Sequence, residues 1–209
     1  MLRRFLAMFI ACVPLLAAAQ EAPDVLLKRV TDELLAIIKV DKDLQSGNTR
    51  KVVELAEQKV LPHFDFARMT RLAVGRNWAQ ASDAQKEALT KEFRTLLVRT
   101  YSASLIAYRN QTIEVKPAKM NAQDKDVVVR TAVLQQGGPP IPIDYAMEKG
   151  DGGWKVYDVV IDGVSLVTTY RGSFNDQIQK GGIDGLVKTL ADRNRSPQAA
   201  PAPKADAKK

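Results

Sequence analysis

Groups that carry covalent and metal chemistry are scarce in this chain of 209 residues. It has one cysteine, Cys12, and one histidine, His63. The sequence contains no H-E-x-x-H motif, no paired histidine and cysteine ligands and no acidic calcium loop, which argues against a dedicated metal site. It also contains no P-loop and no G-x-G-x-x-G fingerprint, so no motif indicates nucleotide binding. A lone histidine is far more often structural than catalytic.

The first residues have the composition of a secretory signal peptide. Arg3 and Arg4 precede an apolar run over residues 5–16, and alanines follow, which predicts cleavage after Ala19. Cys12 would leave with this segment, so we expect a mature protein without a disulfide, a thiolate metal site or a cysteine nucleophile. The alternative, Cys12 as the acylated cysteine of a lipoprotein, is disfavoured because the apolar run before it would be very short. No later stretch approaches about 20 apolar residues, so we expect no transmembrane helix.

The sequence is 45% apolar and 26% charged. This balance of apolar and charged residues is typical of a folded globular domain, which the rest of the chain can form. We expect one domain over residues 20–195 and a flexible Ala/Pro/Lys tail over residues 196–209, which has three prolines and little to bury. The formal net charge is +7, but the signal peptide and the tail each carry +2 of it, which leaves +3 on the domain. This small excess, together with export, argues against nucleic-acid binding.

Apolar residues recur at spacings of three and four in the first part of the domain, which predicts a helical part over about residues 24–80. We expect Asp24 to cap the first helix and the Ser-Gly-Asn sequence at 46–48 to break it. A second helix should end near Pro62, and Asp65 is placed to cap a third.

The longest predicted helix begins at a capping box formed by Ser82 and Gln85. Its apolar stripe is wide, which favours packing against a sheet. The stripe consists of Leu89, Phe93, Leu96, Leu97, Tyr101, Leu105 and Tyr108.

The hydrophobic period then changes to two, which predicts β-strands. Glycine-rich turns at 137–140 and 150–153 join consecutive strands, as in an antiparallel meander. After Gly163 the helical period returns, with a break at Gly181 and Gly182. This order predicts an α+β fold in which helices cover one face of an antiparallel four-stranded sheet. The four strands are expected over residues 111–116, 126–135, 141–149 and 154–161.

Two of these strands, 126–135 and 154–161, are apolar on both faces. Their side chains are compatible with a packed core and also with a cavity for an apolar ligand between sheet and helices. Asp144 and Asp158 lie on strands and are the candidates for a buried acid pair, although turn capping and partial exposure is the simpler interpretation. An enzyme therefore stays an alternative that no motif supports.

Short motifs in a fixed order over about residues 24–192 narrow these alternatives. The first half has LPHFDF (61–66) followed by Met69, GRNW (75–78) and TY (100–101). The second half has IDY (143–145), WKVYDV (154–159), GVSLV (163–167), YR (170–171) and GIDGL (182–186). Together they resemble the MlaC family, also called toluene-tolerance proteins. The resemblance covers most of the mature chain and leaves out the tail.

The resemblance implies a soluble periplasmic phospholipid carrier that maintains the lipid asymmetry of the outer membrane. Such carriers move lipids between an outer-membrane lipoprotein–porin complex and an inner-membrane ABC transporter with an MCE-domain ring. The implied fold is an NTF2-like body of sheet and helices with an added helical part, in which acyl chains are buried and the headgroup lies near solvent. The phospholipid is cargo, no cofactor is implied, the family is not enzymatic, and we expect a monomer.

A lipid cavity would take its walls from the long helix, from one face of the sheet and from the segment after the last strand. The candidate lining residues are Leu97, Tyr101, Leu105, Ile143, Tyr145, Met147, Tyr157, Val159, Ile161, Val164, Leu166, Val167 and Tyr170. Arg76 and Arg171 are candidate neighbours of the headgroup phosphate because a guanidinium suits phosphate oxygens, and solvated arginines are the alternative. Two other functions stay open: an NTF2-like periplasmic enzyme, which needs a buried acid or histidine facing the cavity, and an adaptor with a fully packed core.

Overall fold

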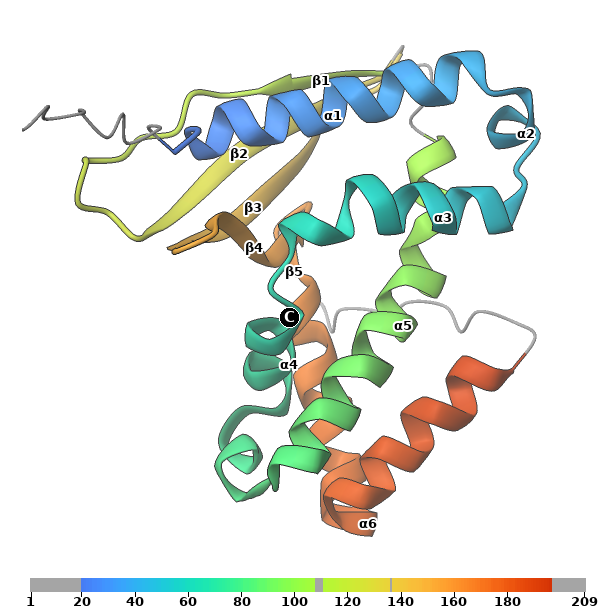
Figure 1. Ribbon diagram of the computed structural model, residues 1–209, viewed down its shortest axis with the longest axis vertical. Helices are drawn as coiled ribbons and strands as arrows, with labels where there is room; N and C mark the ends of the chain where they lie inside the picture. The colour runs from blue at the N-terminus through green and yellow to red at the C-terminus, as the bar shows by residue number, and fades with distance from the viewer. Residues whose placement is uncertain (1–19, 108–110, 136, 197–209) are drawn as a thin grey trace, which may run out of the picture.

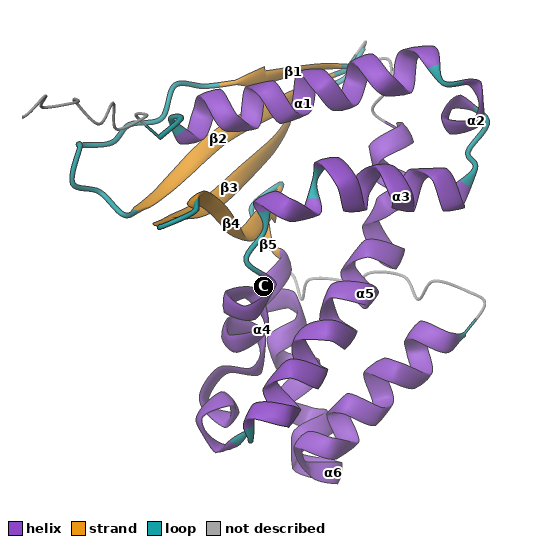
Figure 2. Cartoon of the chain, viewed as in Figure 1, coloured by secondary structure: helices purple, strands orange, loops and turns teal. Residues whose placement is uncertain are grey.

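In the described part of the chain, helices before and after flank five consecutive strands (Figure 2). The computed structural model describes residues 20–107, 111–135 and 137–196, except for the side chains at positions 103 and 105–107. The expected signal peptide and all but the first residue of the expected tail lie outside these ranges. The helices are α1 (Pro23–Val40), α2 (Lys42–Gln45), α3 (Thr49–Lys59), η1 (Leu61–His63), α4 (Phe66–Val74), η2 (Gly75–Gln80), α5 (Asp83–Ala107) and α6 (Leu166–Arg195). The strands are β1 (Thr112–Val115), β2 (Asp126–Leu134), β3 (Ile141–Gly150), β4 (Gly153–Ile161) and β5 (Val164–Ser165).

Two of the predicted helix caps are confirmed. The Asp65 carboxylate accepts a hydrogen bond from the Arg68 backbone N–H at 2.8 Å, at the start of α4. At the start of α5, the Ser82 hydroxyl accepts from the Gln85 backbone N–H (3.2 Å) and the Gln85 amide oxygen accepts from the Ser82 N–H (3.0 Å). Both caps satisfy N–H groups that have no partner inside the helix.

The predicted cap of the first helix is wrong. Ala22 is the N-cap residue and Pro23 is the first helical residue, so α1 begins before Asp24. Proline suits this position because it has no N–H to satisfy and its φ is already helical. The Asp24 carboxylate instead accepts a hydrogen bond from the Ala118 N–H at 3.3 Å and so ties α1 to the segment after β1.

The strands form one antiparallel meander in the order β1-β2-β3-β4-β5. The four predicted strands are present, and the short β5, which pairs with the end of β4, makes a fifth. Phe64 forms a parallel bridge with Val156, so it covers the first half of the β4 edge while β5 covers the second. Both contacts place the chain segments that lead into α4 and α6 against the same strand.

A β-bulge in β4 changes which side chains lie on the face of the sheet that α1 covers. Met147 pairs with Val156 and Ala146 pairs with Asp158, which leaves Tyr157 as the extra residue. Simple alternation would place Tyr157 on the face of Val159, but the bulge turns it to the other face. There the Arg68 guanidinium lies over the Tyr157 ring, 3.5 Å from its centroid.

α1 covers the inner face of the sheet, whereas α4, α5 and α6 form a helical lobe that extends away from it (Figure 1). Leu26 and Leu27 of α1 pack with Val129 and Val156 of the sheet. Among the described residues, no helix is both long enough and apolar enough to cross a membrane.

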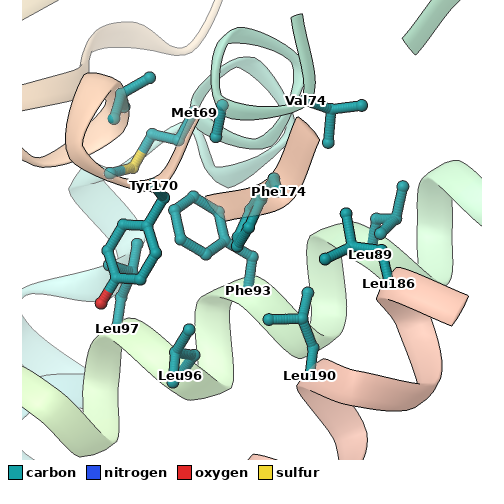
Figure 3. Close-up of a cluster of buried hydrophobic side chains, with 12 residues drawn as sticks. Met69, Val74, Leu89, Phe93, Leu96, Leu97, Tyr170, Phe174, Leu186 and Leu190 are labelled. Atoms are coloured by element: carbon teal, nitrogen blue, oxygen red, sulfur yellow. The ribbon is translucent and has the colours of Figure 1, made fainter. Parts of the chain in front are cut away.

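The helical lobe has its own core (Figure 3). The ring of Phe93 on α5 meets the rings of Tyr170 and Phe174 on α6 nearly edge to face, at centroid distances of 5.0 and 5.1 Å. The expectation that the α5 stripe packs against the sheet is therefore wrong, because α5 packs mainly against α3, α4 and α6. The predicted break in α6 is present at Gly182, whose φ of 67° interrupts the helix.

Candidate functional site

An apolar cavity of about 270 Å³ lies between the inner face of the sheet and the helices α1, α3 and α5. The segment from Leu61 to Phe66 closes it beside β4. The walls from the sheet are Ile113, Thr131, Val133, Ile143, Tyr145, Val156, Val159 and Ile161. The walls from the helices and connecting segments are Leu26, Leu27, Val30, Thr31, Leu34, Leu35, Ala56, Val60, Leu61, His63, Phe64, Phe66, Met69, Leu97, Val98, Tyr101, Ser102, Ser104 and Leu166.

Each wall follows from the period of its element. In β3, Ile143 and Tyr145 are two positions apart and therefore both face the cavity. In β4, Val156 and Val159 are three positions apart, and both face the cavity because the bulge lies between them. In α1, residues at spacings of three and four lie on one face of the helix, which is why Val30 and Leu34 line the same wall.

The polar groups in this lining are few and several are engaged. The Thr131 hydroxyl donates to the Ile143 carbonyl oxygen at 2.8 Å, so its hydrogen-bond donor is satisfied within the protein. Tyr101 and Tyr170 are hydrogen-bonded to each other, and burial raises the pKa of both phenols above the usual value. The cavity thus offers mainly hydrocarbon to whatever occupies it.

The one imidazole of the chain lies in the cavity wall. Burial lowers the pKa of His63, the positive charges of Arg29 and Lys155 lower it further, and the weaker effects of Glu21 and Glu33 oppose this. No Asp, Glu, Lys or Arg is among the described residues that line the cavity. The lowered pKa favours the neutral form of the His63 imidazole, and no carboxylate is among the described residues that line the cavity with it.

The two strand aspartates lie on the outer face of the sheet, away from the cavity. The Asp158 carboxylate accepts from the Ser165 hydroxyl at 2.5 Å and from the Val167 N–H at 3.2 Å, at the start of α6. Turn capping is thus what the structure shows for Asp158. The described part of the chain also contains no cluster of three His, Cys, Asp or Glu residues that could hold a metal ion.

Of the thirteen candidate lining residues, seven lie in the cavity wall: Leu97, Tyr101, Ile143, Tyr145, Val159, Ile161 and Leu166. Met147 belongs instead to the core between sheet and α1, and Val167 and Tyr170 to the core of the helical lobe. Val164 is exposed, and the bulge turns Tyr157 away from the cavity, so that it packs under Arg68 and against the core of the helical lobe. The side chain of Leu105 lies outside the described residues.

The two candidate phosphate neighbours lie together but not at this cavity. Arg76 and Arg171 line a separate surface hollow with Arg71, and none of the described residues lines both the hollow and the cavity. α4 separates the two, since its Phe66 and Met69 face the cavity while Arg71 faces the hollow.

The elements of the wall that sequence reasoning missed are α1, α3, the segment around Phe64 and the strands β1 and β2. The apolar stripe of α1 was visible in the sequence, but a stripe has the same spacing whether it meets a core or a cavity. Phe64 gave no local signal, because its position depends on pairing with Val156, far away in the sequence.

The MlaC protein family matches residues 28–192 of this chain. The chain belongs to the MlaC family. It is 29% identical over 190 residues to toluene tolerance protein Ttg2D of Pseudomonas putida, a match that covers 90% of this chain and 87% of that protein. It is 26% identical over 184 residues to the intermembrane phospholipid transport system binding protein MlaC of Haemophilus influenzae, covering 87% and 86%. The motifs that suggested the MlaC family therefore identified it correctly.

A solved structure shares the fold of this MlaC-family chain. It is the phospholipid-binding protein from Ralstonia solanacearum in complex with a phospholipid, and it superposes with a TM-score of 0.76 at 44% sequence identity. The match covers 83% of this chain and 97% of that one. The likeness therefore includes both the sheet and the helical lobe.

Proposed function

We propose that this protein is a periplasmic phospholipid carrier that holds acyl chains in the cavity between the sheet and helices α1, α3 and α5. The observation that carries the proposal is the hydrocarbon wall of that cavity, which has no charged Asp, Glu, Lys or Arg among its described residues. The same fold in a solved phospholipid-binding protein in complex with a phospholipid supports it. An adaptor with a fully packed core would leave this cavity unexplained.

The proposal includes shuttling between two membrane complexes, an outer-membrane lipoprotein–porin complex and an inner-membrane ABC transporter with an MCE-domain ring. The name of the Haemophilus influenzae relative, which places it in an intermembrane phospholipid transport system, supports this role. The carrier would in this way maintain the lipid asymmetry of the outer membrane. The expected signal peptide over residues 1–19 would bring the protein to the periplasm.

The energetics suit a carrier. Each acyl methylene that the cavity buries gains about 0.8 kcal/mol relative to water, so about 10 methylenes gain on the order of 8 kcal/mol. A bilayer offers the chains nearly the same environment, so exchange between membrane and protein is close to neutral overall. The protein lowers the free-energy barrier that a lipid meets when it crosses water between two membranes. The direction of transport comes from the partners or from ATP hydrolysis elsewhere.

Lipid extraction and mass spectrometry of the purified protein test the proposal. We expect the exported protein to carry phospholipid and Val159→Glu to lose it, because an unpaired carboxylate in an apolar cavity is strongly unfavourable. Val159 is 7% exposed and lines the cavity. The matched control is Val128→Glu, the same substitution at a position that is 49% exposed on the outer face of the sheet, and it should keep its lipid.

A second variant separates loss of the cavity from loss of the fold. Ile161→Trp adds apolar volume at the cavity wall without a charge, and we expect it to lower the lipid content while the circular dichroism spectrum stays unchanged. Wild-type protein free of phospholipid, or equal lipid in Val159→Glu and Val128→Glu, would refute the proposal.

A further inference from the structure

A surface hollow lies where the end of α4, η2 and the first turns of α6 meet. We call it the arginine hollow, because Arg71, Arg76 and Arg171 all line it and all three are exposed. No carboxylate is among the described residues that line it. In the described part of the chain, none of the three arginines forms an ion pair, so three positive charges without an ion-pair partner border the hollow.

The hollow has a fixed frame. The Arg171 Nε–H donates to the Leu72 carbonyl oxygen at 3.0 Å, which holds this guanidinium against α4. On the other side, Asn77 and Asn175 contact each other at 3.5 Å between η2 and α6. Because one N–H of Arg171 is used in this frame, the guanidinium keeps further donors for a ligand.

The hollow also has free space on its α6 side. A Cβ added to Gly172 would meet no atom within 4 Å. A side chain from another molecule therefore has room to enter beside the arginines. The large apolar residues that are exposed in the described chain, such as Val40 and Val128, do not line the hollow.

We propose that the arginine hollow is a docking site for an acidic segment of a protein partner, with an Asp or Glu side chain inserted between the guanidinium groups. Arginine suits this occupant because its planar fork binds a carboxylate through two parallel hydrogen bonds. An anionic bilayer is the less suitable occupant, since a membrane surface cannot enter a hollow and no exposed large apolar side chain accompanies the arginines to insert into it. The inference goes beyond lipid carriage, because α4 separates the hollow from the cavity.

The test measures binding of a labelled glutamate homopolymer peptide to the full-length purified protein by fluorescence anisotropy. We expect wild-type binding that weakens with salt, and a loss of about tenfold in affinity for Arg71→Glu and for Arg171→Glu, since each reversal replaces an attraction with a repulsion. Arg50→Glu is the matched control: its side chain is 88% exposed on α3, outside the hollow, and its reversal should change the affinity less than about twofold.

Gly172→Phe tests insertion separately from charge. It fills the space on the α6 side without changing a charge, and we expect it to weaken peptide binding as strongly as Arg71→Glu does. Both variants should retain the lipid content of the wild type, which keeps this test distinct from the test of lipid carriage.

Three results would overturn the docking proposal. One is the absence of measurable peptide binding at low salt. Another is equal binding by wild type, Arg71→Glu and Arg50→Glu, which would mean attraction to the overall positive charge only. The last is flotation of the protein with phosphatidylglycerol vesicles that Arg71→Glu abolishes and Gly172→Phe leaves unchanged. This result would identify the hollow as a membrane-facing surface.

Discussion

Emptying the cavity should destabilise the protein by an amount that its volume sets. A void of about 270 Å³, at about 24 cal/mol per Å³ of unfilled core, costs about 6 kcal/mol. Domains of ordinary stability unfold at a cost of about 5–15 kcal/mol, so this loss is a large part of the total. We therefore expect the delipidated protein either to be much less stable or to close its walls around the void.

Differential scanning calorimetry of lipid-loaded and delipidated protein measures this loss. At about 2–4 °C per kcal/mol for a domain of this size, the melting temperature should fall by roughly 12–24 °C on delipidation. Reloading from phospholipid vesicles should restore it. Free lipid has to be held constant between runs, because a ligand that binds only the folded state raises the melting temperature by mass action.

Hydrogen exchange distinguishes an open void from a closed one. If the walls move together, the free-energy loss shrinks and the amides of β2, β3 and β4 should change their protection. The reasoning is refuted by delipidated protein, verified by mass spectrometry, whose melting temperature and exchange protection both equal those of the loaded form.

Three further changes test the surroundings of the cavity. Arg68→Ala removes a guanidinium that stacks on Tyr157 and pairs with carboxylates of β2 and β3, and should lower the free energy of unfolding in urea by about 2 kcal/mol. Asp158→Ala leaves the Val167 N–H at the start of α6 without its acceptor and should cost about 1–2 kcal/mol in the same assay. Burial lowers the pKa of His63 in the folded state, so stability should fall as the pH drops below about 6.5, where the unfolded imidazole takes up a proton.

The Arg68 change and the pH effect each have a control. Replacing the exposed Arg50 by alanine should change stability by less than about 0.5 kcal/mol, and an equal effect of Arg68→Ala would contradict the role given to that guanidinium. For the pH effect, His63→Gln should flatten the stability curve between pH 5 and 7, followed by circular dichroism. A curve that keeps its slope in this variant would assign the loss to carboxylates instead.

Much of the fold could be predicted because its signals are local. The Asp65 cap, the Ser82–Gln85 capping box and the break at Gly182 depend on a few neighbouring residues, and all three are present. The start of α1 was missed because two neighbouring residues both suit a helix start: Asp24 as an N-cap and Pro23 as the first helical residue, which is the role that the structure shows. The partners of α5 were missed because a wide apolar stripe fits other helices as well as a sheet.

The cavity could be predicted only in part, because its shape depends on long-range packing. Ile143 and Tyr145 followed from strand alternation, but one extra residue in β4 removed Tyr157 from the inner face. Tyr170 was apolar enough to suggest a wall and instead fills the core of the helical lobe. The wall formed by α1 and Phe64 required knowing which segments lie over the sheet, which no local pattern contains.

The central claim is that hydrocarbon tails occupy the cavity between the sheet and helices α1, α3 and α5. A phospholipid with a diazirine at the end of one acyl chain, loaded into the protein and activated by light, tests this most directly when the labelled residues are mapped by mass spectrometry. We predict labels on cavity residues such as Leu97, Val133 and Phe64. Labels confined to outer residues such as Val128 and Leu134, in protein that is still folded, would contradict it.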